Sequence, residues 1–331
     1  MNRAVSVLAA AAALVVLLAG NLCALDIRGA VRQGLKELKA EKGSADLCAL
    51  TDATYVRVNG KTSEAYVDLI QEETGCSLGK GNLLFFHRAT YHPLKIALFR
   101  KDTKQCFVIS YNGDQVQTQG YDLGLEVTSK PGFWKEVGGP LAPDAFTVGS
   151  MAHAWACGAP QDLLKCAEFH NHLCAGVSSG YMIAKVIRDK YPLEKGERYT
   201  WIASPVLCKD DAIQMLLDLT PGKKGLFVQK LTETQREQTA LENPAGILLV
   251  WNQKEGKGRG VVFHFNWDKA SRKDKDKLKT MLGMLPHLER PEAFVDVVKE
   301  FDVTPQMLER LTTAETNPYK WLDLTKYYSG D

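Results

Sequence analysis

The chain has 331 residues, which is enough for about two domains of ordinary size. Its composition, 45% hydrophobic and 24% charged, is typical of a globular protein and excludes a disordered, collagenous or multi-span membrane protein. Lys and Arg number 41 against 39 Asp and Glu, so the formal net charge of +2 gives no indication of a nucleic-acid partner.

Residues 1–24 have the pattern of a secretory signal peptide. Arg3 precedes an apolar run over 4–19, and Leu22-Cys23-Ala24 offers a cleavage site before Leu25. The run is shorter than the roughly 20 residues of a membrane span, so we expect cleavage rather than an uncleaved anchor. The mature chain is then expected in the periplasm or outside the cell, with no membrane span.

The region 25–145 is predicted to be an N-terminal α+β half. Periodic apolar residues predict helices, and short apolar runs between turn signals predict strands. The predicted helices cover 27–40 and 62–73, and the predicted strands 54–58, 83–86, 96–99 and 107–111. The stretch 120–143 is rich in glycine and proline, which indicates the domain boundary.

The region 146–331 is predicted to be a second α+β domain with a helical tail. A helix over 146–167, with a possible break at 158–160, leads through a non-helical segment at 168–175. The remaining predicted helices cover 176–190, 210–219, 269–285 and two short tail segments, and the predicted strands 199–203, 225–229, 246–251 and 260–265. Helices mixed with hairpin-like groups of strands favour the α+β class.

A faint internal repeat links the two regions. In each, a helix leads to a Gly-Lys turn and then to a strand, with Gly79-Lys80 in the first half and Gly222-Lys223 in the second. This order predicts two related halves.

The donor residues His170, His172 and Cys174 alternate along the predicted non-helical segment. Side chains at alternate positions of an extended segment point the same way, so the three could bind one ion. Imidazole and thiolate together suit a divalent metal, zinc above iron or copper. The alternative is a pair of surface histidines beside a buried cysteine.

Cys208 is the second candidate, at the start of a predicted helix that follows a strand. This position favours a thiolate, so Cys208 could be a fourth metal ligand or a catalytic nucleophile. A small core residue is the alternative. Asp210 and Asp211 follow it and could orient a ligand imidazole or act as general base, with Asp211 our catalytic candidate.

These motifs resemble the E-subunit family of formylmethanofuran dehydrogenase. That family has a His-Gly-His-x-Cys-Pro-Gly segment, then Cys-x-x-Asp-Ala-x-Gln and a Gly-Lys turn, and the resemblance covers roughly 160–265. The first half carries a fragment of the same type, Thr74-Gly75-Cys76-Ser77-Leu78-Gly79-Lys80-Gly81-Asn82-Leu83. Asn171 replaces the usual Gly, Ala175 replaces the Pro, and Leu219 stands where the family often has Cys. The chain has no pair of cysteines spaced for a C-terminal zinc ribbon.

The resemblance implies an α+β core, a homodimer, and a His/Cys metal site in a cleft, without naming a substrate. We therefore expect an exported metal-binding protein whose site can support metal-assisted catalysis on a small molecule. One alternative is a non-catalytic protein that binds or delivers a metal or metal cofactor. Another is a thiol redox protein that uses Cys174 and Cys208. The sequence leaves open whether the chain is an enzyme.

Overall fold

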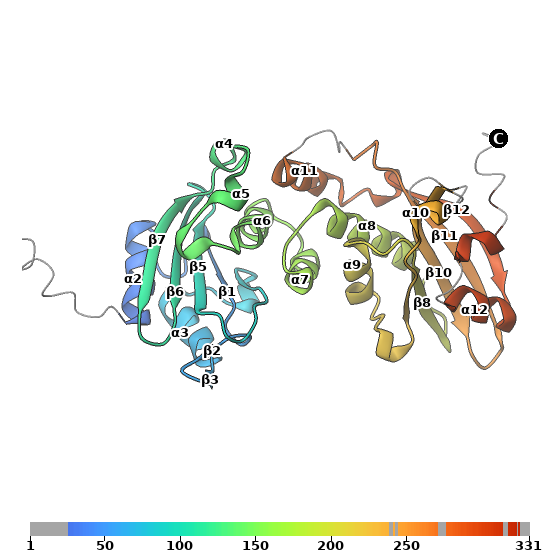
Figure 1. Ribbon diagram of the computed structural model, residues 1–331, viewed down its shortest axis with the longest axis horizontal. Coiled ribbons are helices and arrows are strands. Elements are labelled where there is room, and N and C mark those ends of the chain that lie inside the picture. Colours follow the sequence, from blue (N-terminus) through green and yellow to red (C-terminus); the bar gives the residue numbers. More distant parts are fainter. Residues whose placement is uncertain are drawn as a thin grey trace, which may run out of the picture.

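The computed structural model describes residues 26–237, 241, 244–270, 276–313, 317–322 and 324, so the predicted signal peptide lies outside the described residues. Helices and strands are mixed, and the strands pair in both parallel and antiparallel fashion, which confirms the α+β class (Figure 1). No helix in the described part of the chain is long and apolar enough to cross a membrane.

The first half is built on a five-stranded sheet with the order β4-β1-β5-β6-β7. Its strands are β1 (Leu47–Thr51), β4 (Leu83–Phe85), β5 (Leu94–Arg100), β6 (Gln105–Tyr111) and β7 (Val116–Asp122), and β2 (Arg57–Val58) and β3 (Lys61–Thr62) form a separate hairpin. Helices α2 (Ile27–Glu37) and α3 (Ala65–Thr74) pack on one face of the sheet, and α6 (Ala145–Ala156) packs on the other.

The second half is built on another five-stranded sheet, with the order β12-β11-β10-β8-β9. Its strands are β8 (Glu197–Ala203), β9 (Leu226–Val228), β10 (Pro244–Asn252), β11 (Lys257–Phe265) and β12 (Val295–Val303). One face packs against α8 (Ala175–Lys190) and α11 (Lys277–Met284), and the other against α12 (Pro305–Thr312). The short helix α10 is Glu233–Glu237, and the 3₁₀ helices η4 (Leu285–His287), η5 (Pro291–Ala293) and η6 (Pro318–Trp321) complete this half.

The two sheets have the same connectivity, which supports the predicted relation between the halves. In the first half, β1 leads through α3 and η1 (Leu78–Lys80) to the parallel strand β4. In the second, β8 leads through α9 (Lys209–Leu216) and η3 (Pro221–Lys223) to the parallel strand β9. Each sheet then continues as an antiparallel meander of three strands.

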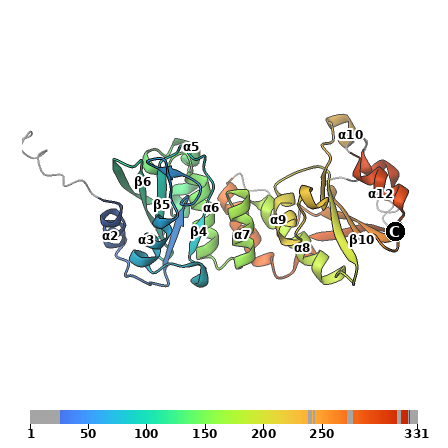
Figure 2. The same ribbon diagram turned by 90° about the horizontal axis from the view of Figure 1, so that it is seen from below.

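The two halves meet through α6 and α7 (Gln161–His170), which lie between the sheets (Figures 1 and 2). One hydrophobic core includes Leu50 of the first sheet and Trp201 of the second. The predicted boundary segment 120–143 contains α4 (Leu125–Thr128), α5 (Phe133–Glu136) and η2 (Gly139–Leu141). Because the core runs through both halves, the division at 145 stays a prediction.

Several predicted element bounds were wrong. The strand predicted at 54–58 is mostly a turn, and its place in the sheet is taken by β1. Thr54 has a positive φ of 83°, which a strand does not allow, whereas β1 is buried on both faces and lacks an alternating pattern. The helix predicted at 146–167 breaks between Ala156 and Gln161, and the second segment continues to His170.

Candidate metal centre

The ligand segment is a tight turn between two helices rather than the predicted extended segment. α7 ends at His170, Asn171 follows with φ 66° and ψ 11°, and Cys174 is the N-cap residue of α8. The non-helical segment predicted from residue 168 therefore begins three residues later. The left-handed conformation of Asn171 reverses the chain, so His170 and His172 face one another although they do not lie on one strand.

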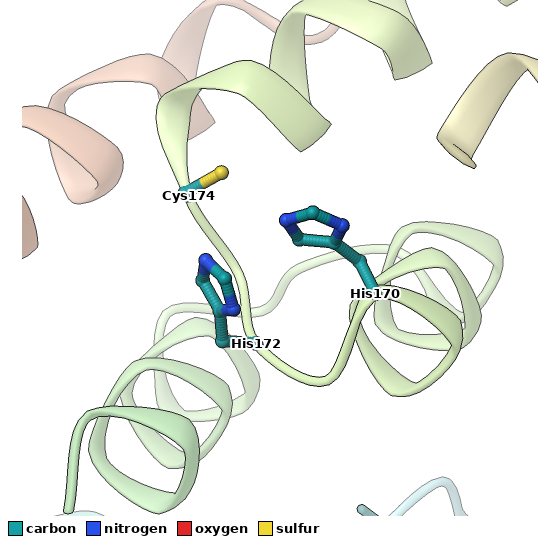
Figure 3. Close-up of side chains that lie close together, drawn as sticks. All are labelled: His170, His172 and Cys174. Atoms are coloured by element: carbon teal, nitrogen blue, oxygen red, sulfur yellow. The ribbon is translucent and has the colours of Figure 1, made fainter. Parts of the chain in front are cut away.

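His170, His172 and Cys174 form a compact set of three donors (Figure 3). One ligand atom from each lies within 4.8 Å of the others, and the two imidazole ring centroids are 4.5 Å apart. Ligand atoms around a tetrahedral zinc ion are about 3.5 Å apart, given metal–ligand bonds of about 2.0–2.3 Å. The separations in the structure, up to 4.8 Å, are thus close to the spacing of zinc ligands.

The two nitrogens of His170 have different surroundings. Nδ1 donates a hydrogen bond to Oδ2 of Asp211, at the start of α9, over 2.6 Å. Nε2 is buried and has no partner at hydrogen-bonding geometry. A metal-binding histidine is usually held in this way, with one nitrogen fixed by a carboxylate and the other free for the ion. The residues present therefore fit a metal.

Cys208 lies beside the three donors but is not a member of the set of three. A Cβ on residue 176 would lie 3.5 Å from the sulfur atoms of both Cys174 and Cys208, so Gly176 leaves room for the two thiols. Interactions with Cys174, and then with His170, lower the pKa of Cys208 to about 4. The pKa of Cys174 is raised, chiefly by the same contact with Cys208. Cys208 is thus the thiolate of the pair.

The charge states of the histidines follow from their surroundings. Cys208 is the largest cause that raises the pKa of His170, and Asp211 adds to it, while burial acts in the opposite direction. Burial is the main cause that lowers the pKa of His172, whose ring also packs edge-on against Phe146 of α6 at 5.5 Å. Burial thus favours the neutral form of His172, whereas the neighbours of His170 favour its protonated form.

Asp210 does not reach this centre. The residue is 2% exposed, and Oδ1 accepts from the indole of Trp201 over 2.7 Å. Oδ2 accepts from the Lys209 ammonium and from the backbone N–H of Leu207. Both oxygens are occupied in fixing the start of α9, so Asp211 is the acidic residue that contacts a candidate ligand.

Sequence reasoning missed a contact between the ligand turn and the first half. The backbone N–H of His87 donates to Oδ1 of Asn171 over 2.6 Å, and Nδ2 of Asn171 donates to the carbonyl of His87 over 3.1 Å. No local signal could have revealed it, because the partners are 84 positions apart. Phe146 was missed for the same reason.

Comparison with known proteins agrees with the resemblance found in the sequence. Residues 169–295 match the family described as FmdE, Molybdenum formylmethanofuran dehydrogenase operon. The matched segment contains the three donors, Cys208 and Asp211, so the resemblance to this family is confirmed for this part of the chain. None of the curated proteins compared matches the chain.

Proposed function

We propose that this chain is an exported metal-binding protein that uses its FmdE-like segment, residues 169–295, to hold a divalent metal. His170, His172 and Cys174 would be the ligands. The observation that carries the proposal is the gathering of three donors whose ligand atoms lie within 4.8 Å of one another, with Nδ1 of His170 held by Asp211. An imidazole oriented by a carboxylate is the usual arrangement of a metal-binding histidine.

Zinc fits this donor set best. Two imidazoles and one cysteine sulfur, which gives up its proton when the metal binds, are common zinc ligands, and a site with three protein ligands keeps one coordination position for water or substrate. Bound there, zinc would act as a Lewis acid and lower the pKa of a water molecule. This is the arrangement of a catalytic rather than a purely structural site, and it supports metal-assisted chemistry on a small molecule.

The chain's own residues supply positioning and proton transfer. Asp211 orients His170, and Phe146 packs against His172. Cys208, as a thiolate beside the donors, can accept a proton or attack an electrophilic carbon. If Cys208 instead completes a closed set of four ligands, the site would store or deliver metal without catalysis.

Metal stoichiometry tests the proposal. The parent protein should carry one zinc ion per chain by mass spectrometry, and His170→Ala, His172→Ala and Cys174→Ala should each lose most of it. His287→Ala, which changes an exposed histidine on η4, is the control and should keep the parent stoichiometry. Full metal content in both His170→Ala and His172→Ala would refute the assignment.

Cys208→Ala separates the two roles of that residue. A loss of metal comparable to that in Cys174→Ala would identify a fourth ligand and favour storage or delivery. Retained metal with altered reactivity toward an electrophilic thiol reagent would identify a free nucleophile and favour catalysis.

A thiol redox role is the second candidate, favoured by the closeness of two free thiols, Cys174 and Cys208. Oxidation of the Cys174 thiol and the Cys208 thiolate would form an S–S bond, release one proton, and pass two electrons to added oxidised glutathione, whose disulfide bond breaks to give two glutathione molecules. Peptide mapping of metal-free protein treated with oxidised glutathione should then find Cys174 joined to Cys208. If both thiols remained free in a glutathione redox buffer set to the reduction potential of an oxidising compartment, this role would be excluded.

Export is part of the proposal and rests on residues 1–24. Cell fractionation should find the chain in the exported soluble fraction, and N-terminal sequencing should begin near Leu25. A chain with intact Met1 in the membrane fraction would show an anchor instead.

A further inference from the structure

The last turn of α7 covers the free edge of the first sheet. β4 is the edge strand of that sheet, and its outer backbone groups would otherwise lack partners within the sheet. Oε1 of Glu168 accepts from the backbone N–H of Phe85 over 3.1 Å, and the Asn171 side chain bonds both the N–H and the carbonyl of His87. The two residues that make these contacts flank the candidate ligand His170.

The second sheet provides an internal comparison. The N–H of Phe86 bonds to Thr51 in the first half, and the N–H of Gln229 bonds to Ala203 in the second. Val228 therefore holds the position of Phe85, and it is 47% exposed. The cover over the edge strand is thus a particular feature of the first half and of the ligand turn.

Asn171 contributes to the ligand turn both through its backbone conformation and through the hydrogen bonds of its side chain. Its φ of 66° is one that glycine and asparagine adopt most readily. Glycine could hold the same turn with no side chain, so the two hydrogen bonds to His87 are what asparagine adds. Those bonds join the turn between His170 and His172 to the segment that directly follows β4 in the other half.

We infer that Asn171 is a positioning residue through which the first half fixes the spacing of the metal ligands. The inference rests on the proposed metal-binding function. A ligand turn tied by two hydrogen bonds to the other half needs less ordering when the ion binds, so it binds the ion more tightly and releases it more slowly. The first half is accordingly part of the metal site, although it supplies no ligand from the set of three.

The test uses Asn171→Gly in the full-length mature chain. Glycine keeps the left-handed turn and removes both hydrogen bonds. We expect zinc affinity, measured by competition with a chromophoric chelator, to fall about 10–100-fold, as when a group that orients a ligand is removed. The absorption spectrum of the Co²⁺-substituted protein should change, and the backbone amide of His87 should exchange hydrogen faster.

Two further variants keep the test specific. Asn171→Asp retains the acceptor for the His87 N–H and should recover part of the affinity. Asn59→Gly is the matched control, because Asn59 also has a positive φ, 51°, and its Nδ2 donates to the carbonyl of Gly113 in the first half. It should bind zinc as the parent does.

Parent-like affinity and an unchanged Co²⁺ spectrum in Asn171→Gly would overturn the inference. The proposed metal site would still stand if His170→Ala lost its metal in the same experiment. An equal loss in Asn59→Gly would show general destabilisation and would also overturn the inference. A parent protein that binds no zinc would refute the metal site itself.

Discussion

His170 links three parts of the structure through one imidazole ring. Its backbone ends α7, its Nδ1 contacts α9, and its Nε2 faces the other donors. A hydrogen bond from Nδ1 to a carboxylate selects the tautomer in which Nε2 is the free donor, and it increases the basicity of Nε2. The affinity of the site for a metal therefore depends on Asp211, which is not itself among the proposed ligands.

Asp211→Asn should weaken metal binding without removing it. Asparagine can still accept from Nδ1, but the carboxylate charge is lost, so we expect affinity to fall about 10–100-fold in a chelator competition assay. Asp296→Asn is the matched control, because Asp296 makes a similar contact with Nδ1 of His264, over 3.1 Å, on β11 and β12. Equal losses in both variants would contradict an orienting role for Asp211.

His153, a buried histidine outside the candidate metal site, should make the free energy of unfolding depend on pH. It is 1% exposed in α6, its Nε2 donates to the carbonyl of Leu123 over 2.7 Å, and burial lowers its pKa below the ordinary value of 6.5. The unfolded chain therefore binds a proton more readily, so this residue destabilises the fold as the pH falls below about 6.5.

His153→Gln keeps a donor for Leu123 and removes the titrating group. Urea unfolding at pH 7, 6 and 5 should show the parent losing stability relative to the variant by up to about 1.4 kcal/mol per pH unit. His287→Gln gives the background for an exposed histidine. Parallel pH profiles for the parent and His153→Gln would contradict the prediction.

At the scale of elements, the close contact of α8 with α9 places Cys208 beside Cys174. A Cβ on Gly180 would lie 2.1 Å from the carbonyl oxygen of Lys209, so only glycine allows the helices to approach this closely. The contact involves the backbone of the residue that follows Cys208. The distance between the two thiols is thus set by helix packing.

Gly180→Ala should push the start of α9 away from α8. Overpacking of this kind costs about 1–3 kcal/mol of unfolding free energy, measurable by urea denaturation. Cys208, which moves with α9, should also react with a thiol reagent at a changed rate. Gly283→Ala is the control, since a Cβ there meets nothing within 4 Å on α11, and it should stay within about 1 kcal/mol of the parent. Parent-like behaviour of Gly180→Ala would show that the helices can separate at no cost.

At the scale of the whole molecule, two sheets of the same connectivity share one chain and one core. Gene duplication can convert a two-fold dimer into such an internal pair. The two halves differ in what they supply to the candidate metal site. The second half contains the three donors, and the first half contacts the turn that holds them through His87.

We retain the homodimer expected from the sequence resemblance as a prediction. Light scattering of the mature protein at several concentrations should give twice the mass of one chain, which is 36.6 kDa before signal removal. A concentration-independent mass of one chain would contradict the prediction and would show that the internal pair stands in place of a dimer.

The local features of the fold could be predicted from the sequence. Apolar runs bounded by turn residues correctly predicted β4, β5 and β6, and the two predicted Gly-Lys turns lie in the 3₁₀ helices η1 and η3. β7 and β12 were not predicted because polar residues interrupt their apolar ones and few of their residues are buried. β1 escaped because a strand buried on both faces has no alternating pattern.

The sequence by itself determined the three donors, since His170, His172 and Cys174 are so close in the chain that a short turn suffices to gather them. Only the tertiary structure decided what surrounds them. Asp211 lies 41 positions from His170, and His87 lies 84 positions from Asn171. These contacts depend on how α9 packs against α7 and on how the end of α7 meets the end of β4. Such packing arises from interactions between distant segments, which the periodicity of any one segment does not encode.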